Sequence, residues 1–207
     1  KQSLKNWYRQ FLRLSKLRRT HKIGNGCIIS KSTELLGAVT IKRNVHLKNK
    51  VILQNGVSVG EGSRLSNIEI REFSQIESNV ICTGAGKGKI RIGKHSYIGF
   101  FNVLDWSNDI TIGDYVHIAG PSTGLWTHSS VYQSLKGIEL SNKDEKYRPT
   151  APIKIGNNVY IGGNCTIYPG ISIEDNSVVA PNSVINKNVK SNTMVGGVPA
   201  KFIKYID

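Results

Sequence analysis

Aliphatic residues recur at every sixth position through residues 155–185 of this chain. An α-helix repeats every 3.6 residues and a strand every two, so a period of six marks a whole repeating unit. The positions four residues later are again apolar or small. The residues in register are Ile155, Ile161, Ile167, Ile173, Val179 and Ile185, and those four positions later are Val159, Cys165, Ile171, Ser177, Ser183 and Val189.

Residues suited to tight corners follow most of these aliphatic positions, as in Ile155-Gly156-Asn157-Asn158. Each repeat is therefore a short strand plus a corner. Repeats this short cannot bury an apolar face alone and must stack into a solenoid. Three faces of one repeat each would make a triangular coil of about 18 residues, a parallel β-helix. The period does not set the handedness, and the usual rule for parallel crossovers favours a right-handed path.

The same register continues upstream, with interruptions. They lie near residues 66–69, 82–91, 105–111 and 129–152, which we expect to be loops. The last is long and polar, and long loops in compact domains tend to carry function. Trp126-Thr127-His128 stands directly before it. The upstream register residues are Ile41, Leu47, Leu53, Val59, Leu65, Ile70, Ile76, Ile92, Ile98, Leu104, Ile112 and Ile118.

The net charge of +14 is concentrated at one end of the chain. Residues 1–22 hold eight of the 28 Lys and Arg residues and no acid. Leu4, Trp7, Phe11 and Leu14 follow at spacings of three and four, which predicts a basic amphipathic helix. It would either pack on the open end of the solenoid or lie on an anionic membrane surface. No motif for reading nucleic acid accompanies the charge, so we expect no nucleic-acid partner.

The composition, with 39% hydrophobic and 20% charged residues, is typical of a soluble globular protein. No apolar run approaches the roughly 18 residues of a membrane span, and the start does not resemble a secretory signal. Cys27, Cys82 and Cys165 are far apart and odd in number, which argues against a disulfide framework and a zinc knuckle. We therefore expect a cytoplasmic protein, at the inner membrane surface if residues 1–22 bind lipid.

The chain resembles the hexapeptide-repeat acyltransferases in four features. They are the six-residue register, the segment 155–164, the Thr127-His128 pair before an excursion and the ending Gly196-Gly197-Val198-Pro199-Ala200-Lys201. The most similar branch is the sugar O-acetyltransferases of the maltose and galactoside type. The resemblance covers residues 90–206, and 39–82 by period only. It implies an all-β fold, a left-handed parallel β-helix over 23–206 with an excursion at 129–152 and a C-terminal cap at 196–206. It also implies a homotrimer that binds acetyl-CoA between subunits and a sugar or surface-polysaccharide acceptor.

In that family a His at the loop position is the general base, and His128 matches it. His128 follows Asp114 by 14 residues, in a run that fits the family pattern. A neutral hydroxyl is a poor nucleophile, and an imidazole can take its proton while the bond to the thioester carbon forms. We expect direct transfer without an acyl-enzyme. His117 and His128 are eleven residues apart, too far for the close His pair of a catalytic zinc site, so we expect no metal.

The resemblance also assigns binding residues. Asn102 matches a position that helps bind the acceptor, and Asp105 and Trp106 adjoin it in the register break. The family's acetyl-CoA contacts fall on Gly163, Pro181, Asn186, Lys187, Lys201 and Lys204. Pro181 can offer only a carbonyl there, and Asn186 stands where a hydroxyl residue is usual.

Two other functions stay open at this point. An amino-sugar N-acetyltransferase would use the same base with a different acceptor pocket. A non-catalytic β-solenoid scaffold would be built from uninterrupted coils with adhesive ends, whereas this chain breaks register at the loop next to His128.

Overall fold

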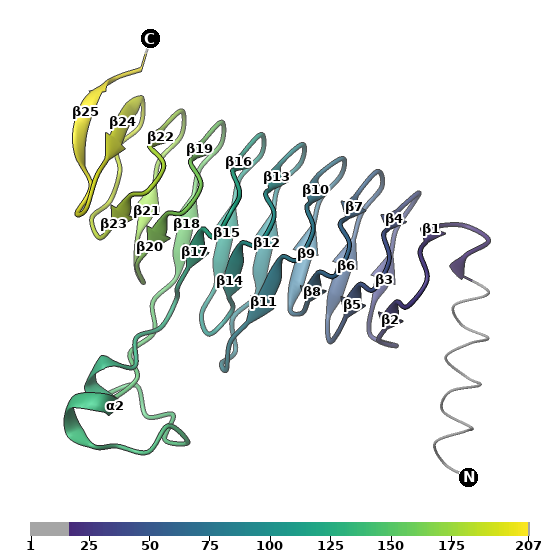
Figure 1. The fold of residues 1–207 in the computed structure, drawn as a ribbon, viewed down its shortest axis with the longest axis horizontal. Helices are drawn as coiled ribbons and strands as arrows, with labels where there is room; N and C mark the ends of the chain where they lie inside the picture. The colour runs from purple at the N-terminus through teal and green to yellow at the C-terminus, as the bar shows by residue number, and fades with distance from the viewer. Residues whose placement is uncertain (1–16, 207) are drawn as a thin grey trace.

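The first seven coils of the described chain each add one short strand to each of three sheets, which we call A, B and C in the order the chain visits them (Figure 1). The computed structural model describes residues 17–206. Every pairing between successive coils is parallel, and the final pairing of β24 with β25 is antiparallel. The chain is thus an all-β parallel solenoid, consistent with the left-handed β-helix that the resemblance implies.

Within residues 17–206, sheet A has ten strands, sheet B eight and sheet C seven. Sheet A consists of β1 (Lys22–Ile23), β4 (Thr40–Ile41), β7 (Ser58–Val59), β10 (Gln75–Ile76), β13 (Tyr97–Ile98), β16 (His117–Ile118), β19 (Tyr160–Ile161), β22 (Val178–Val179), β24 (Thr193–Gly196) and β25 (Lys201–Tyr205). Sheet B consists of β2 (Ile28–Ile29), β5 (His46–Leu47), β8 (Arg64–Leu65), β11 (Ile81–Thr83), β14 (Val103–Asp105), β17 (Gly124–Leu125), β20 (Thr166–Ile167) and β23 (Val184–Ile185). Sheet C consists of β3 (Glu34–Leu35), β6 (Val51–Leu53), β9 (Ile68–Ile70), β12 (Ile90–Ile92), β15 (Ile110–Ile112), β18 (Ile153–Ile155) and β21 (Ser172–Ile173).

The register residues form the core of the solenoid. The six aliphatic residues in register between 155 and 185 are each at most 3% exposed, and those four positions later are at most 6% exposed. Ser177 and Ser183 enter this apolar column because each hydroxyl donates a 2.6 Å hydrogen bond to a backbone carbonyl, of Glu174 and Ala180. The predicted inward positions are therefore confirmed.

Where the register is regular, one coil takes 18 residues: Ile41 pairs with Val59, and Ile161 with Val179. Asparagines occupy the left-handed backbone region at several corners, among them Asn158 and Asn176. The Asn158 Nδ2 donates to Asn176 Oδ1 at 3.2 Å, so the corners also stack from coil to coil.

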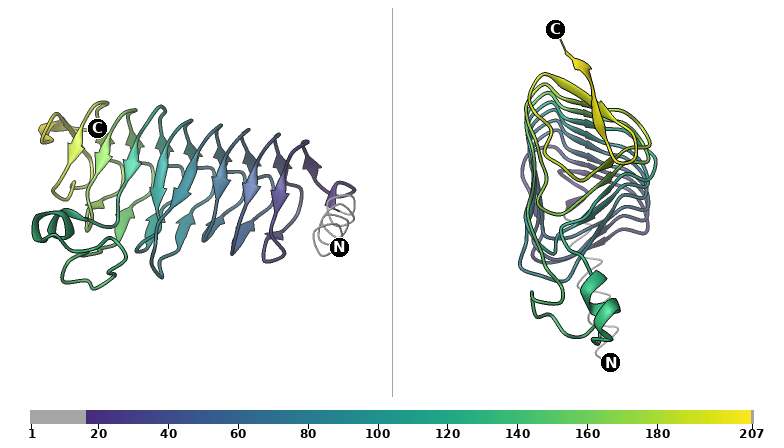
Figure 2. Two further views of the ribbon diagram at one scale, coloured as in Figure 1. Left: turned by 60° about the horizontal axis from the view of Figure 1, so that its bottom comes forward. Right: turned by 90° about the vertical axis from the view of Figure 1, so that its left-hand side faces the viewer.

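The predicted breaks in the register all lie at one corner, between sheets B and C. On three consecutive coils the chain makes a longer connection here, from β11 to β12, from β14 to β15 and from β17 to β18. Ile118 pairs with Ile161, 43 residues on, because the third connection is the excursion. Viewed along the solenoid, the excursion leaves the stacked coils at a single corner (Figure 2).

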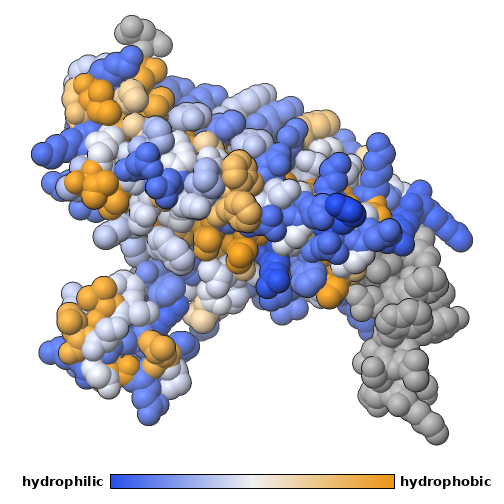
Figure 3. All heavy atoms as spheres, in the orientation of Figure 1, coloured by the Kyte–Doolittle hydropathy of each residue, from blue (hydrophilic) through white to orange (hydrophobic). Residues whose placement is uncertain are grey.

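The excursion contains one element that the sequence did not predict, the helix α2 (Val131–Lys136), which ends at Gly137 in the left-handed conformation. His128 and Thr150 form an antiparallel bridge that closes its neck. The segment stands away from the coils (Figure 1), and hydrophobic side chains gather on its surface (Figure 3). Leu135 and Leu140 are among its exposed residues.

At the C-terminal end β25 turns back antiparallel on β24, within the segment 196–206 expected to form a cap. Residues 1–16 of the amphipathic helix expected over 1–22 lie outside the described residues, so its packing or membrane role stays a prediction. The expected bound at residue 22 is wrong, because residues 18–20 form a turn and Lys22 begins β1. Between Leu17 and Ile206 the structure has no helix that is long and apolar enough to cross a bilayer.

Replacing Ile153 by Ala should test the packing of the inner column. Ile153 is 0% exposed in β18, which pairs with β15 and β21 in sheet C, so its truncation should lower the free energy of unfolding by about 2–5 kcal/mol. Urea unfolding followed by circular dichroism measures the change. The adjacent Lys154 points outward, and Lys154→Ala should change stability by less than about 0.5 kcal/mol. Equal losses for both variants would contradict the assigned inward face.

Candidate active site

His128 lies at the neck of the excursion, with its side chain 23% exposed. Its Nδ1 is 2.5 Å from Oδ2 of Asp105, the last residue of β14 on the preceding coil. The contact exists because the β14–β15 and β17–β18 connections leave adjacent coils at the same corner. Nε2 of His128 makes no hydrogen bond to any part of the chain that the structure describes.

Asp105 is completely buried and surrounded by hydrogen-bond donors. Its Oδ2 accepts from the Thr127 backbone N–H at 2.9 Å. Its Oδ1 accepts from the Ser107 backbone N–H at 3.0 Å and the Ser107 hydroxyl at 2.7 Å. Burial alone would raise the pKa of Asp105, but the hydrogen bonds from Ser107 and His128 outweigh it, and the pKa is lowered from its ordinary value. Asp105 is therefore a carboxylate at neutral pH.

A buried carboxylate at Nδ1 fixes the state of the ring. The carboxylate accepts a hydrogen bond from Nδ1–H, which keeps the proton of the neutral ring on Nδ1. Nε2 is left with a free lone pair, and the ring is held in one orientation. A base oriented by a carboxylate in this way can take a proton from a hydroxyl. The arrangement also stabilises the imidazolium that forms when it does.

Arg148, near the end of the excursion, ties the third connection into this network. It is only 7% exposed. Its Nη2 donates to the Ser107 hydroxyl oxygen at 2.9 Å, and its Nη1 to the Ala85 carbonyl at 3.4 Å. Loop 84–89, the turn after β14 and the excursion are thus held together beside His128.

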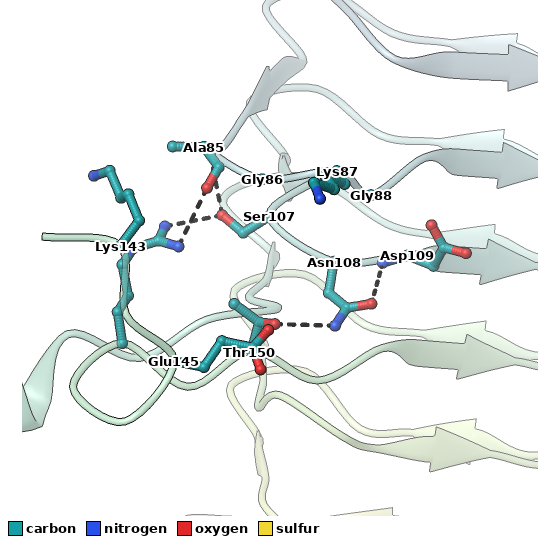
Figure 4. Close-up of a pocket in the computed structure, with 11 residues that line it drawn as sticks. Ala85, Gly86, Lys87, Gly88, Ser107, Asn108, Asp109, Lys143, Glu145 and Thr150 are labelled. Carbon is teal, nitrogen blue, oxygen red and sulfur yellow. Dashed lines mark hydrogen bonds between the residues drawn. The ribbon is translucent and has the colours of Figure 1, made fainter.

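A cavity of about 450 Å³ opens between these three connections (Figure 4). Loop 84–89, with three glycines and two lysines, forms one wall. A Cβ at Gly86 would collide with the Ser107 carbonyl oxygen, and one at Gly88 with the Asn108 backbone, so close approach of neighbouring coils accounts for both glycines. The lining residues are Ala85, Gly86, Lys87, Gly88, Ser107, Asn108, Asp109, Lys143, Glu145, Arg148 and Thr150.

Two of the three residues expected at the acceptor are buried and hydrogen-bonded inside the solenoid. Asn102 and Asp105 are both 0% exposed. The Asn102 side chain accepts from the Thr123 N–H at 2.8 Å and donates to the Ala119 carbonyl at 3.2 Å, which binds one coil to the next. Asp105 orients His128. Trp106 is partly buried and packs on the core, and its Nε1 has no hydrogen-bond partner among residues 17–206.

Sequence reasoning did not identify Ser107 or Arg148 as members of the site. Ser107 lies two residues after Asp105 within the predicted break, and Arg148 lies within the excursion. The signal that could have identified both residues is that the three register breaks stack at one corner. This stacking places the three connections side by side.

Of the residues expected to contact acetyl-CoA, Lys187 and Lys201 line one cavity of about 430 Å³ together with Lys190. Asn186 and Lys204 are exposed but do not line it. Gly163 and Pro181 lie at a different corner, between sheets A and B, where Gly163 has room for no side chain because a Cβ would be 2.5 Å from the Gly120 carbonyl oxygen. Over the described part of the chain, no three His, Cys, Asp or Glu side chains group closely enough to bind a metal ion.

Comparison with known proteins agrees with this architecture. The family described as bacterial transferase hexapeptide (six repeats) matches residues 152–187. Galactoside O-acetyltransferase of Escherichia coli (strain K12) is 37% identical over 118 residues, 57% of this chain and 55% of that protein. The chain thus spans about half the length of this curated relative.

Two solved structures extend the comparison. A hexapeptide-repeat-containing acetyltransferase of Vibrio cholerae O1 biovar eltor, VCA0836, crystallised with acetyl coenzyme A, is 34% identical over 61% of this chain and 71% of its own, with a TM-score of 0.48. UDP-N-acetylglucosamine acyltransferase from Campylobacter jejuni is 16% identical over 87% of this chain and 73% of its own, and its TM-score of 0.59 shows a shared fold. The chain therefore carries bacterial transferase hexapeptide repeats over residues 152–187, and it is similar to a galactoside O-acetyltransferase over about half of that protein's length.

The tautomer of His128 is directly testable. Nitrogen-15 NMR of the imidazole at mildly alkaline pH should show the proton on Nδ1, with the signal assigned from a His128→Gln variant. In Asp105→Asn the amide can donate to Nδ1, so the proton should move to Nε2. A wild-type ring protonated on Nε2 would contradict the geometry described above.

Proposed function

We propose that the protein is an acetyl-CoA-dependent O-acetyltransferase that acts on a sugar or a surface-polysaccharide precursor. The observation that carries the proposal is the Asp105–His128 pair, a base held in one orientation next to a cavity. The names of the relatives give the donor and acceptor class: one acetylates a galactoside, and another was crystallised with acetyl coenzyme A. The same base would serve an amino-sugar acceptor, which is the second candidate.

The reaction would proceed in one ternary complex. Nε2 of His128 removes the proton as the acceptor oxygen attacks the thioester carbonyl carbon. The C–O bond forms, the C–S bond breaks, and the proton passes from His128 to the departing thiolate. Burial raises the pKa of Cys82 to about 12 and also raises that of Cys165, so neither thiol is a ready nucleophile for a covalent intermediate.

The donor would lie along the corner that carries His128. The chain passes from β17 through β20 to β23 along sheet B, so the cavity lined by Lys187 and Lys201 lies two coils beyond the excursion. Parallel strands are about 4.8 Å apart, which makes this separation about 10 Å along the axis. Lysines there can meet the phosphates while the extended pantetheine arm carries the thioester to His128. We propose a homotrimer, as the family resemblance implies, with the donor in the cleft between subunits.

Replacing His128 by Ala should lower the rate of acetyl transfer by roughly 10²–10⁴-fold, because the general base is removed. Purified protein is incubated with radiolabelled acetyl-CoA and a panel of hydroxyl and amino sugars. His46→Ala, a histidine on β5 of sheet B, is the matched control and should keep the wild-type rate.

Three results would overturn this account. A near-normal rate in His128→Ala would exclude His128 as the base, and a trapped acetyl-protein would exclude direct transfer. Transfer only to amines would make the protein an N-acetyltransferase. No transfer and no acetyl-CoA binding would indicate a scaffold.

Lys201→Glu should raise the apparent KM for acetyl-CoA by about tenfold, because a cation facing the phosphates becomes an anion. Steady-state kinetics at saturating acceptor measures the change. Lys48→Glu removes an exposed lysine far along the chain from this cavity and controls for the change in net charge. An unchanged KM in Lys201→Glu would place the phosphates elsewhere.

A further inference from the structure

We infer that the cavity beside His128 is an acceptor subsite for a negatively charged group, a carboxylate or a phosphate, carried next to the sugar that is acetylated. This inference rests on the proposed function and names its substrate class.

The position of the cavity makes it continuous with the reacting centre. Ser107 and Thr150 belong to its lining, and both also contact the catalytic histidine: the Ser107 hydroxyl is 3.3 Å from His128 Nδ1, and Thr150 is bridged to His128 through the backbone. A volume of about 450 Å³ lies within the range of small-ligand pockets. An acceptor whose hydroxyl meets His128 can therefore place a neighbouring substituent here.

Arg148 gives the cavity its charge. Arg148 is only 7% exposed, but its guanidinium has no carboxylate within 4.0 Å among residues 17–206. Its protein partners are uncharged, a hydroxyl and a carbonyl, and they use two of its five N–H donors. The nearby Asp105 is already saturated by donors from Thr127, Ser107 and His128. A buried cation left without a direct partner is costly, and an anionic ligand would supply that partner.

The rim adds two more cations from separate segments, Lys87 on loop 84–89 and Lys143 on the excursion (Figure 4). Within the described chain neither forms an ion pair. Of the two acids in the lining, Asp109 is already paired with Arg91 at 3.2 Å, which leaves Glu145. The Lys143 Nζ donates to the Leu140 carbonyl at 2.8 Å, which does not neutralise its charge. The lining thus holds three cations, and among its acids only Glu145 has no ion pair within the described residues.

Backbone donors complete the site. The N–H groups of Gly86, Lys87 and Gly88 make no hydrogen bond within residues 17–206, and these residues line the cavity. Successive free N–H groups in a loop can bind the oxygens of an anion. Carboxylate and phosphate share this chemistry, so the acceptor is an acidic glycan or a phosphorylated sugar derivative.

The test compares acceptors that share one disaccharide skeleton and differ only in the residue next to the acetylated sugar: a neutral hexose, a hexuronic acid, or a hexose phosphate. With the full chain and saturating acetyl-CoA, kcat/KM should be at least tenfold higher for one or both charged acceptors than for the neutral one. Comparing kcat/KM for the hexuronic acid and hexose phosphate acceptors shows whether the subsite prefers a carboxylate or a phosphate. In Lys87→Ser/Lys143→Ser this preference should fall to less than about threefold, whereas Lys48→Ser should retain it.

The outcomes separate this inference from the proposed function. Transfer with no preference for a charged acceptor would overturn the subsite while leaving the acetyltransferase intact. A preference that survives in the double lysine variant would also overturn it, because the selectivity would arise elsewhere. Failure of transfer to every acceptor would contradict the proposed function. Calorimetric binding of the charged and neutral disaccharides without acetyl-CoA would then still decide the subsite, and equal affinities would exclude it.

Discussion

Each coil must hydrogen-bond to the coils on both sides along three parallel sheets, and this requirement decides where the sequence is free to vary. A residue inserted within a strand would shift the inward column out of register, so extra residues can enter only at corners. Here three consecutive coils lengthen the same corner, between sheets B and C. Parallel stacking of the coils then places the three connections side by side. The site is built from segments that the coils themselves bring together.

Within that corner, one buried carboxylate organises the chemistry. Asp105 is removed from water and remains ionised because Ser107, Thr127 and His128 donate to it. The same bonds orient the imidazole and tie it to the rigid sheet B, since Asp105 is the last residue of β14. Arg148 extends the network to the excursion through Ser107. The orientation of the His128 ring and the order of the excursion are thus coupled, and a ligand that contacts Arg148 would bind next to His128.

The sequence predicts the fold well because every coil repeats the same physical problem. Inward positions such as Ile161 and Ser183 follow from the six-residue period alone. The excursion before β18 is predicted because the period is interrupted there. Handedness and His128 came from family resemblance, since neither is encoded in a periodicity. Asn102 and Asp105 were expected at the acceptor and are instead buried, because a polar residue in a register break can serve the fold as readily as a ligand. The position of Arg148 and the formation of α2 depend on how the excursion folds back onto the coils. No local sequence pattern specifies this tertiary arrangement.

The central claim is that Asp105 acts through His128, and a double-mutant cycle on the rate of acetyl transfer tests it most directly. Asp105→Asn should lower kcat by roughly 10²–10⁴-fold in the wild-type background, with little change in the KM for acetyl-CoA. In the His128→Ala background the same substitution should cost almost nothing further, because residues that act as a unit are not additive. Losses that multiply in the double variant, or a single Asp105→Asn variant with full activity, would contradict the account.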